Sequence, residues 1–285
     1  QLLTVIAGSD PADSATREAD SRKTDYAAAL DSNSLSGKRI GVMRFAAGFG
    51  TDIAFDAALA KLRERGAILV DIKEFDDKDI GDNEFEVLLT EFKAGLNDYL
   101  RTSPAPLPVR SLADVIAFNV MHQAQEMPLF GQEIFLAAQE KKRLDNPAYI
   151  KARRTSFRAA GPNGIDRLLK AHRLVALVGP TMPPAWKIDA ANGDQYPGAG
   201  AGSLAAVAGY PHLTVPMGMV KGLPVGLSFL GPKWSDALLL SLGYAYEQAR
   251  GPFPAAQLLP SIEASPLVAP YFEPQRLSLP VSATP

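Results

Sequence analysis

Short apolar runs alternate with helix-like repeats in the first part of the chain. The run K-R-I-G-V-M-R (38–44) is β-branched and predicts a strand, and A-I-L-V-D-I (67–72) predicts a second. Between them, Thr51 can cap a helix that reaches about Arg65. The candidates for the buried face of this helix are Ile53, Ala57, Leu59 and Leu62. A strand, a helix and a strand in this order predict a βαβ unit and therefore a parallel sheet.

The middle of the chain has helical periodicity. Glu84–Leu100 carries apolar residues at helical spacing, namely Phe85, Leu88, Leu89, Phe92 and Leu96. Ser111, followed by Asp114, predicts the start of a helix that runs to about His122. Another helix is predicted over 132–143. Asn146-Pro147 opens a longer one that ends near Ala160, because proline suits a first helical turn.

The last third returns to strands. The apolar run 173–181 predicts a strand that is buried on both faces. Two further strands, 211–220 and 223–231, are separated by Lys221-Gly222 and predict a hairpin. Ahead of them lie a glycine-rich segment, 193–203, and a short alanine-rich helix that ends at Gly209. Ser235 or Asp236 caps a final helix to about Arg250.

These elements divide the chain into three parts. Residues 1–37 form a polar connection that follows the end of a helix, Q-L-L-T-V-I-A, for which Gly8 is the predicted C-cap. Residues 38–250 carry the regular structure. Residues 251–285 are rich in proline and predict an extended tail. Because the opening residues resemble a helix end, we expect the chain to begin in the middle of a longer protein.

Composition excludes several classes of protein. The 285 residues include 29 Lys+Arg against 31 Asp+Glu, so the net charge is −2 and no polybasic arm exists. No nucleic-acid partner is expected, and the cluster Lys151, Arg153, Arg154 and Arg158 is interpreted as a solvated helix face. There is no cysteine, and no apolar run long enough for a membrane span.

A search for self-contained catalytic or metal sites finds none. The histidines His122, His172 and His212 are far apart and form no metal-binding spacing, so we expect no metal and no cofactor. Each histidine by itself is interpreted as a structural or surface residue. The glycines of 193–203 allow backbone N–H groups to approach a ligand, but the segment is equally interpretable as a flexible connection.

Five segments, in order, resemble the C-terminal part of the amidase signature family of serine hydrolases. Three of them recur across the family, and two look like its bacterial peptide-amidase branch. The first three are V-G-P-T-M-P-P (178–184), A-G-Y-P-H-L-T-V-P-M-G (208–218) and L-P-V-G-L-S-F-L-G (223–231); the other two are 83–100 and E-M-P-L-F-G-Q-E-I-F (126–135). The resemblance implies an α/β fold: the C-terminal portion of a single large mixed, twisted sheet covered by helices.

The resemblance also implies a chemistry that this sequence does not carry. Family members cleave carboxamides with a Ser nucleophile, a bridging Ser in a cis peptide and a Lys base. The lysine and the glycine/serine-rich signature precede the segment that residues 2–13 resemble, so no catalytic residue is assigned here. We expect an N-terminal catalytic half of the same protein as the partner, and a small-molecule or peptide amide as the substrate.

Two alternatives stay open beside an amidase that releases ammonia. One is the A subunit of a glutamine-dependent tRNA amidotransferase, whose relatives clamp glutamine with an Arg and an Asp. The positions that correspond to this Arg and Asp fall near Ser156 and Ala199, which carry no charge. Arg153, Arg154 or Asp194 could be displaced equivalents. At the aligned positions themselves the charged clamp is missing. The other alternative is a non-enzymatic binding domain.

Three residues are candidates for the acyl-side wall of a substrate pocket. Phe130 lies between a proline-containing turn and Gly131, at a predicted break between helices, and Gln132 follows it. Asp194 belongs to the glycine-rich segment and could accept from a backbone amide or cap its own turn. Phe130 could equally be an ordinary core residue.

Overall fold

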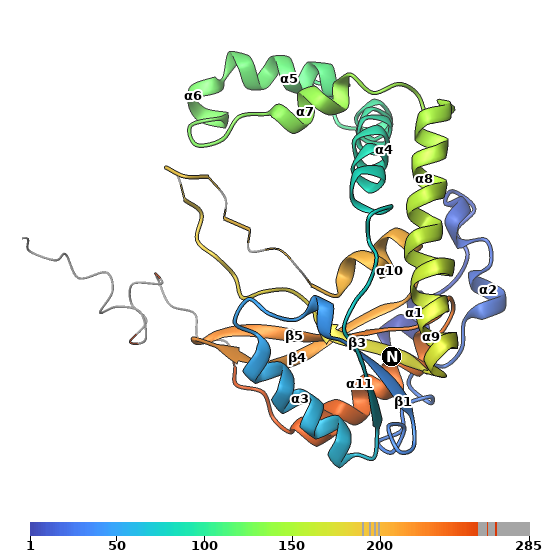
Figure 1. The fold of residues 1–285 in the computed structure, drawn as a ribbon. Coiled ribbons are helices and arrows are strands. Elements are labelled where there is room, and N and C mark those ends of the chain that lie inside the picture. The colour runs from blue at the N-terminus through green and yellow to red at the C-terminus, as the bar shows by residue number, and fades with distance from the viewer. Residues whose placement is uncertain are drawn as a thin grey trace, which may run out of the picture.

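A five-stranded sheet organises the computed structural model, which describes residues 1–189, 191–193, 195, 196, 198, 200–255, 261 and 266. Its strand order is β2-β1-β3-β5-β4 (Figure 1). The strands are β1 (Arg39–Met43), β2 (Ile68–Ile72), β3 (Ala176–Pro180), β4 (His212–Val220) and β5 (Leu223–Leu230).

The sheet is mixed, as the sequence predicts. β1 pairs in parallel with both β2 and β3, which confirms the βαβ unit. β5 runs antiparallel to β3, and β4 runs antiparallel to β5. Lys221 and Gly222 join β4 to β5 with φ angles of 48° and 81°, which is the left-handed pair that a tight two-residue hairpin requires. Every residue of β3 is buried.

Helices cover both faces of the sheet (Figure 1). One face packs on α3 (Asp52–Glu64) and α11 (Asp236–Arg250) in a core that includes Phe229 and Tyr246. The other face packs on α8 (Pro147–Ala160), the π-helical turn η3 (Gly161–Asp166), α9 (Arg167–His172) and α10 (Gly202–Ala208). The family fold expected from the sequence is therefore present over the described residues.

The buried face of α3 differs from the prediction. Its buried side chains are Phe55, Ala58, Leu59 and Leu62. Ile53 is 88% exposed and Ala57 is also exposed, so both were assigned to the wrong side of the helix. The buried face follows the spacing i, i+3, i+4, i+7 from Phe55. Ile53 and Ala57 each lie two positions from Phe55, so their side chains point about 200° away from it around the helix. Thr51 does not cap α3 with its side chain, because its hydroxyl donates to the Gly48 carbonyl.

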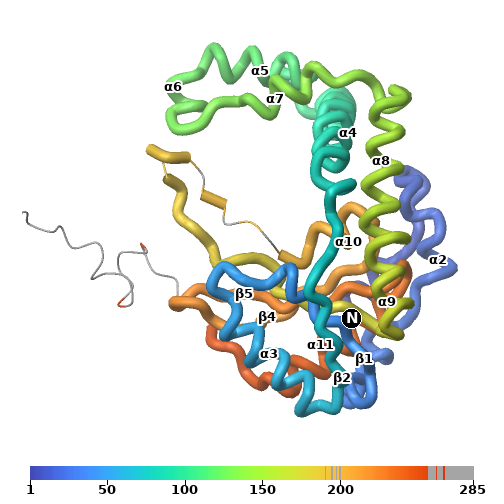
Figure 2. The backbone as a smooth tube through the Cα atoms, in the orientation of Figure 1, coloured from blue at the N-terminus to red at the C-terminus, as the bar shows by residue number. Residues whose placement is uncertain are grey.

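Four helices extend beyond the sheet (Figures 1 and 2). They are α4 (Gly81–Thr102), α5 (Leu112–Met121), α6 (Gln123–Glu126) and α7 (Glu133–Gln139). Of these, α4, α5 and α7 share a small core around Leu89, Leu112 and Ala138. α7 ends before the predicted Arg143. The Lys93 ammonium group donates to the carbonyls of Gln139 and Lys141, at 2.6 and 2.9 Å, and holds the chain after α7 against α4.

The predicted helix starts at Ser111 and Asn146 are confirmed, because each side chain accepts a hydrogen bond from its own first turn. At the other end of the chain, α1 (Leu2–Ile6) stops at Ala7 in extended backbone, so Gly8 is not its C-cap. The short helices η1 (Ser14–Thr16) and α2 (Ala19–Arg22) follow, and η2 (Arg44–Ala46) comes directly after β1. Most of the proline-rich tail lies outside the described residues. Among the described helices, none is long and apolar enough to cross a membrane.

Candidate functional site

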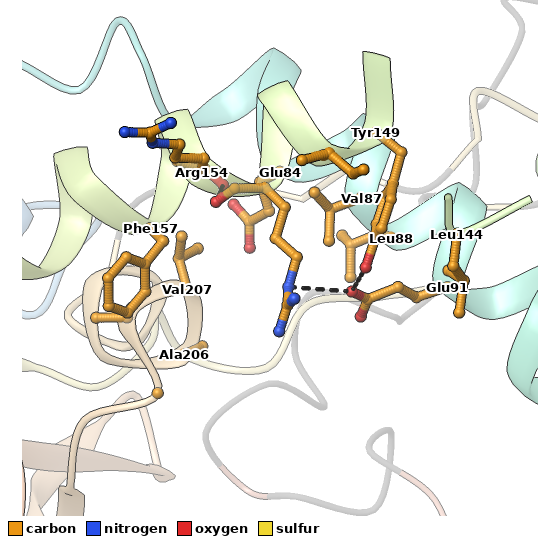
Figure 3. Close-up of a pocket in the computed structure, with 15 residues that line it drawn as sticks. Glu84, Val87, Leu88, Glu91, Leu144, Tyr149, Arg154, Phe157, Ala206 and Val207 are labelled. Carbon is orange, nitrogen blue, oxygen red and sulfur yellow. Dashed lines mark hydrogen bonds and ion pairs between the residues drawn. The ribbon is translucent and has the colours of Figure 1, made fainter. Parts of the chain in front are cut away.

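A groove of about 930 Å³ lies between α4, α8 and α10 (Figure 3). Its walls are mainly apolar: Val87 and Leu88 come from α4, Phe157 from α8 and Val207 from α10. Leu88 is 56% exposed and Phe157 is 43% exposed, which is unusual for large apolar side chains. The groove is therefore an apolar surface that nothing among the described residues covers.

Charged side chains lie along one rim of this groove. The Tyr149 hydroxyl donates to the Glu91 carboxylate at 2.5 Å, and Arg153 pairs with the same carboxylate at 3.7 Å (Figure 3). Burial, followed by the bond to Glu91, raises the pKa of Tyr149. Figure 3 shows the Arg154 guanidinium pointing away from this pair. Burial also raises the pKa of Glu84, more than its hydrogen bond from the Ser203 hydroxyl lowers it.

No group of the groove is arranged as a nucleophile. Ser156 is the buried hydroxyl in its wall, and that hydroxyl donates to the carbonyls of Ala152 and Arg153 in its own helix. No histidine lines the groove. The arrangement can bind an apolar group with polar contacts at its rim, but an amide bond would need a nucleophile from elsewhere.

A second polar cluster lies on the sheet itself. The Ser228 hydroxyl is 2.6 Å from His212 Nε2 and donates to the Thr181 hydroxyl at 2.8 Å. The Thr181 hydroxyl lies 2.6 Å from the Thr214 hydroxyl. Ser228 is fully buried, whereas Thr214 is exposed. Because Ser228 has no access to a substrate, its contact with histidine does not make it a nucleophile.

Strand register brings this hydroxyl cluster (Thr181, His212, Thr214 and Ser228) together. Thr214 pairs with Ser228 across β4 and β5, and Thr181 directly follows β3. Burial of part of the His212 ring lowers its pKa, so the imidazole is neutral at pH 7. His212 considered alone does not indicate the cluster, because its partners lie on or after other strands. The signal was the alternation His-Leu-Thr in β4, which puts two polar side chains on one face of a strand.

Two glycines of the glycine-rich segment, Gly200 and Gly202, pack against residues of the same cluster. Gly200 has a φ of +149°, and a Cβ on it would lie 2.6 Å from the Thr181 carbonyl oxygen. A Cβ on Gly202 would lie 3.5 Å from the His212 ring. A side chain at position 200 would therefore push the segment away from β3.

Two of the predicted substrate-wall residues, Phe130 and Gln132, do not line this groove. Phe130 lies in the connection between α6 and α7 and is 46% exposed. Gln132 faces α5 instead: its amide accepts from Asn119 Nδ2 at 3.1 Å and donates to the Ile116 carbonyl at 3.3 Å. Asp194 lies outside the described residues, as does Ala199. Among the residues that the structure describes, no group of three His, Asp or Glu side chains is placed to hold a metal ion.

Comparison with known proteins places this chain in a family. A protein-family model described as Amidase matches residues 1–240. The chain belongs to the amidase signature family. It is 32% identical over 257 residues to a probable amidase of Arabidopsis thaliana, a match that covers 87% of this chain and 45% of the relative. It is also 32% identical over 271 residues to the A subunit of glutamyl-tRNA(Gln) amidotransferase from Pseudomonas aeruginosa, covering 87% of this chain and 51% of that protein.

Solved structures agree with the expected branch. The native peptide amidase of Stenotrophomonas maltophilia is 46% identical, with a TM-score of 0.78 over 89% of this chain and 51% of that chain. The peptide amidase PAM, solved with the competitive inhibitor chymostatin, is 48% identical, with a TM-score of 0.80 over 87% of this chain and 50% of that chain. The chain thus spans about half the length of the relatives that it matches.

Proposed function

We propose that this chain is the C-terminal part of an amidase that hydrolyses a carboxamide, such as a peptide C-terminal amide, to an acid and ammonia. The observation that carries the proposal is the identity of 46–49% to peptide amidase structures over 87–89% of the chain. The serine of the groove, Ser156, and the serine of the hydroxyl cluster, Ser228, are both buried. In this proposal, the Ser, the bridging Ser and the Lys of the family come from residues outside this sequence.

The exposed apolar side chains support a partner segment of that kind. On α4, Phe85 is 47% exposed and Phe92 is 37% exposed, although both belong to its apolar face. β4 is also an edge strand of the sheet, paired only with β5 among the described strands. An apolar helix face and an open strand edge both favour further covering structure, because each is costly to leave in water. The N-terminal catalytic half is the covering structure that we propose.

The test is ammonia release by the full-length gene product. N-acetylated peptide amides and acetamide are supplied without any nucleotide or tRNA, and ammonia is measured over time. Steady ammonia release from the peptide amide, with the peptide acid as product, supports the proposal. No release from any amide by a folded protein contradicts it.

Resemblance to the amidotransferase of Pseudomonas aeruginosa favours a second candidate, a subunit that takes ammonia from glutamine. Ser156, at the predicted place of the glutamine-binding Arg, is 3% exposed and its hydroxyl is bonded within α8. Arg153, one turn away in the same helix, is paired with Glu91. Glutamine hydrolysis faster than peptide amide hydrolysis would select the second candidate over the first.

A further inference from the structure

The proposed reaction gives no role to the hydroxyl cluster, yet its four side chains are joined by a continuous series of short hydrogen bonds. Three hydroxyls and one imidazole form an unbroken chain of contacts of 2.6, 2.8 and 2.6 Å, from His212 through Ser228 and Thr181 to Thr214. This series of hydrogen bonds starts at a ring nitrogen of His212, which is exposed, passes through the fully buried Ser228 and ends at the exposed Thr214. Gly226 makes this closeness possible, because a Cβ there would lie 2.6 Å from Thr214 Oγ1 and 2.7 Å from Thr181 Oγ1.

The hydrogen bonds of this series can all be donated in one direction or all in the other. Each hydroxyl has one hydrogen, so when Ser228 donates to Thr181, His212 must donate its Nε2–H to Ser228. Thr181 then donates to Thr214, and the Thr214 hydrogen points outward. With the proton on Nδ1 of the neutral ring, every bond can reverse, and Thr214 then turns a lone pair outward. The Thr214 hydroxyl can therefore serve as a donor or as an acceptor of a hydrogen bond.

The segment that follows Thr181 carries apolar and aromatic side chains. Met182 follows Thr181, and its sulfur is 4.0 Å from the Tyr196 hydroxyl. The Tyr196 and Trp186 rings are in contact, with centroids 5.1 Å apart, and both remain more than a third exposed. Polar groups combined with exposed aromatic rings are typical of a site for a small, partly apolar ligand.

We propose that the Thr214 hydroxyl binds a backbone amide on the acyl side of a peptide substrate. Thr181, Ser228 and His212 are positioning residues that hold it, and Trp186 and Tyr196 offer apolar surface to the neighbouring substrate side chain. This inference rests on the proposed amidase function. An amide offers both an N–H and a C=O, so it can use either direction of the hydroxyl chain. In the proposed amidase, the groups that attack the carboxamide come from outside this sequence, so Thr214 is assigned to substrate binding and not to the attack.

The experiment measures binding apart from turnover. An N-acetyl dipeptide alcohol has acyl-side amides but no carboxamide, and its dissociation constant is measured by calorimetry with the full-length gene product. Thr214→Val keeps the β-branched shape and removes the hydroxyl. We expect it to weaken binding by about 2- to 12-fold, equivalent to about 0.5–1.5 kcal/mol for one neutral hydrogen bond. Thr214→Ser retains the hydroxyl and should bind like the wild type, as should the distant control Thr102→Val.

A second measurement separates binding from general damage. Thr214→Val should lower kcat/KM for an N-acetyl dipeptide amide by the same factor while acetamide hydrolysis stays within about twofold. Thr181→Val should also lower kcat/KM for the dipeptide amide, by raising KM. Thr181→Ser, which keeps the hydroxyl, should have the KM of the wild type. The inference is overturned if the wild type does not bind the alcohol, if Thr214→Val binds as the wild type does, or if Thr214→Ser is as weak as Thr214→Val. Equal loss for both substrates also overturns it. Failure of ammonia release alone would contradict the amidase proposal, and the binding measurement would still decide whether Thr214 holds an amide.

Discussion

Between α6 and α7, a short stretch of chain presents Phe130 to solvent and turns Gln132 toward α5. The two side chains are two residues apart but face different surroundings. Phe130 has a large exposed ring available to a substrate or to another part of the protein. Gln132 uses both ends of its amide to tie α7 to α5. At the residue scale, both residues stay predictions for the pocket wall, and the hydrogen bonds of Gln132 give it a structural role to test against that prediction.

These different surroundings predict different effects in the full-length gene product. Phe130→Ala is expected to raise KM for peptide amides more than for acetamide, because small amides reach only the catalytic end of the pocket. Asp194→Ala should act like Phe130→Ala. Gln132→Ala should instead lower the free energy of unfolding by about 1–2 kcal/mol, because two hydrogen bonds are lost. Steady-state kinetics and urea unfolding measure the two effects.

The prediction for Phe130 fails if both substrates are affected equally. For Gln132, a change in KM with no loss of stability would show that its amide faces the substrate after all.

His212 predicts a pH dependence of stability. Its pKa in the folded protein is lowered by burial, while the unfolded chain has the ordinary value of about 6.5. The unfolded state therefore takes up the proton first, and stability decreases as the pH falls below about 6.5. The strand and helix beside the ring, β5 and α10, carry no charged residue that could compensate. His212→Gln should flatten this dependence between pH 7 and pH 5, as measured by thermal unfolding; an unchanged slope would argue against it.

At the scale of elements, close approach of β1 to its neighbours depends on a glycine. A Cβ on Gly41 would lie 2.6 Å from Leu174, 2.7 Å from Leu177 and 2.9 Å from Ile72. All three contacts come from buried side chains on the same face of the sheet. Gly95 is different, because it is exposed within α4 and a Cβ there would meet nothing within 4 Å.

These two glycines give a matched pair of substitutions. Gly41→Ala should destabilise the protein by about 1–3 kcal/mol through overpacking. Gly95→Ala should stabilise it by about 0.5–1 kcal/mol, because alanine favours the helix. Urea unfolding of the full-length gene product measures both. Destabilisation by Gly95→Ala would show instead that another part of the protein packs closely on this face of α4.

At the scale of the whole molecule, apolar surface is left open in two regions. One is the groove between α4, α8 and α10, and the other is the apolar face of α4. β4 adds an open strand edge. Hydrophobic surface of this kind favours association with another segment or another molecule.

The isolated 285-residue chain is therefore expected to be inactive and to associate. It should release no ammonia from simple or peptide amides, because we propose that the Ser, the bridging Ser and the Lys of the family come from outside this sequence. It should also bind a hydrophobic dye and elute larger than a monomer in gel filtration. Turnover that survives removal of every copurifying fragment would refute the first expectation, and a monomer that binds no dye would refute the second.

Local pattern was sufficient for much of this molecule. The apolar runs located all five strands, and the capping residues Ser111 and Asn146 located two helix starts, because strand alternation and helix capping depend on near neighbours in the chain. Five short segments in order were sufficient for the family, which the match over residues 1–240 confirms.

Contacts between distant residues decided the rest. α7 ends at Gln139, whose carbonyl accepts a hydrogen bond from Lys93 of α4, and Ile53 is exposed because the phase of α3 follows its packing on the sheet. The hydroxyl cluster joins Thr181, His212 and Ser228, which lie on or directly after three different strands. Only the register of those strands brings their side chains within hydrogen-bonding distance, and that register is a property of the assembled sheet rather than of any one segment.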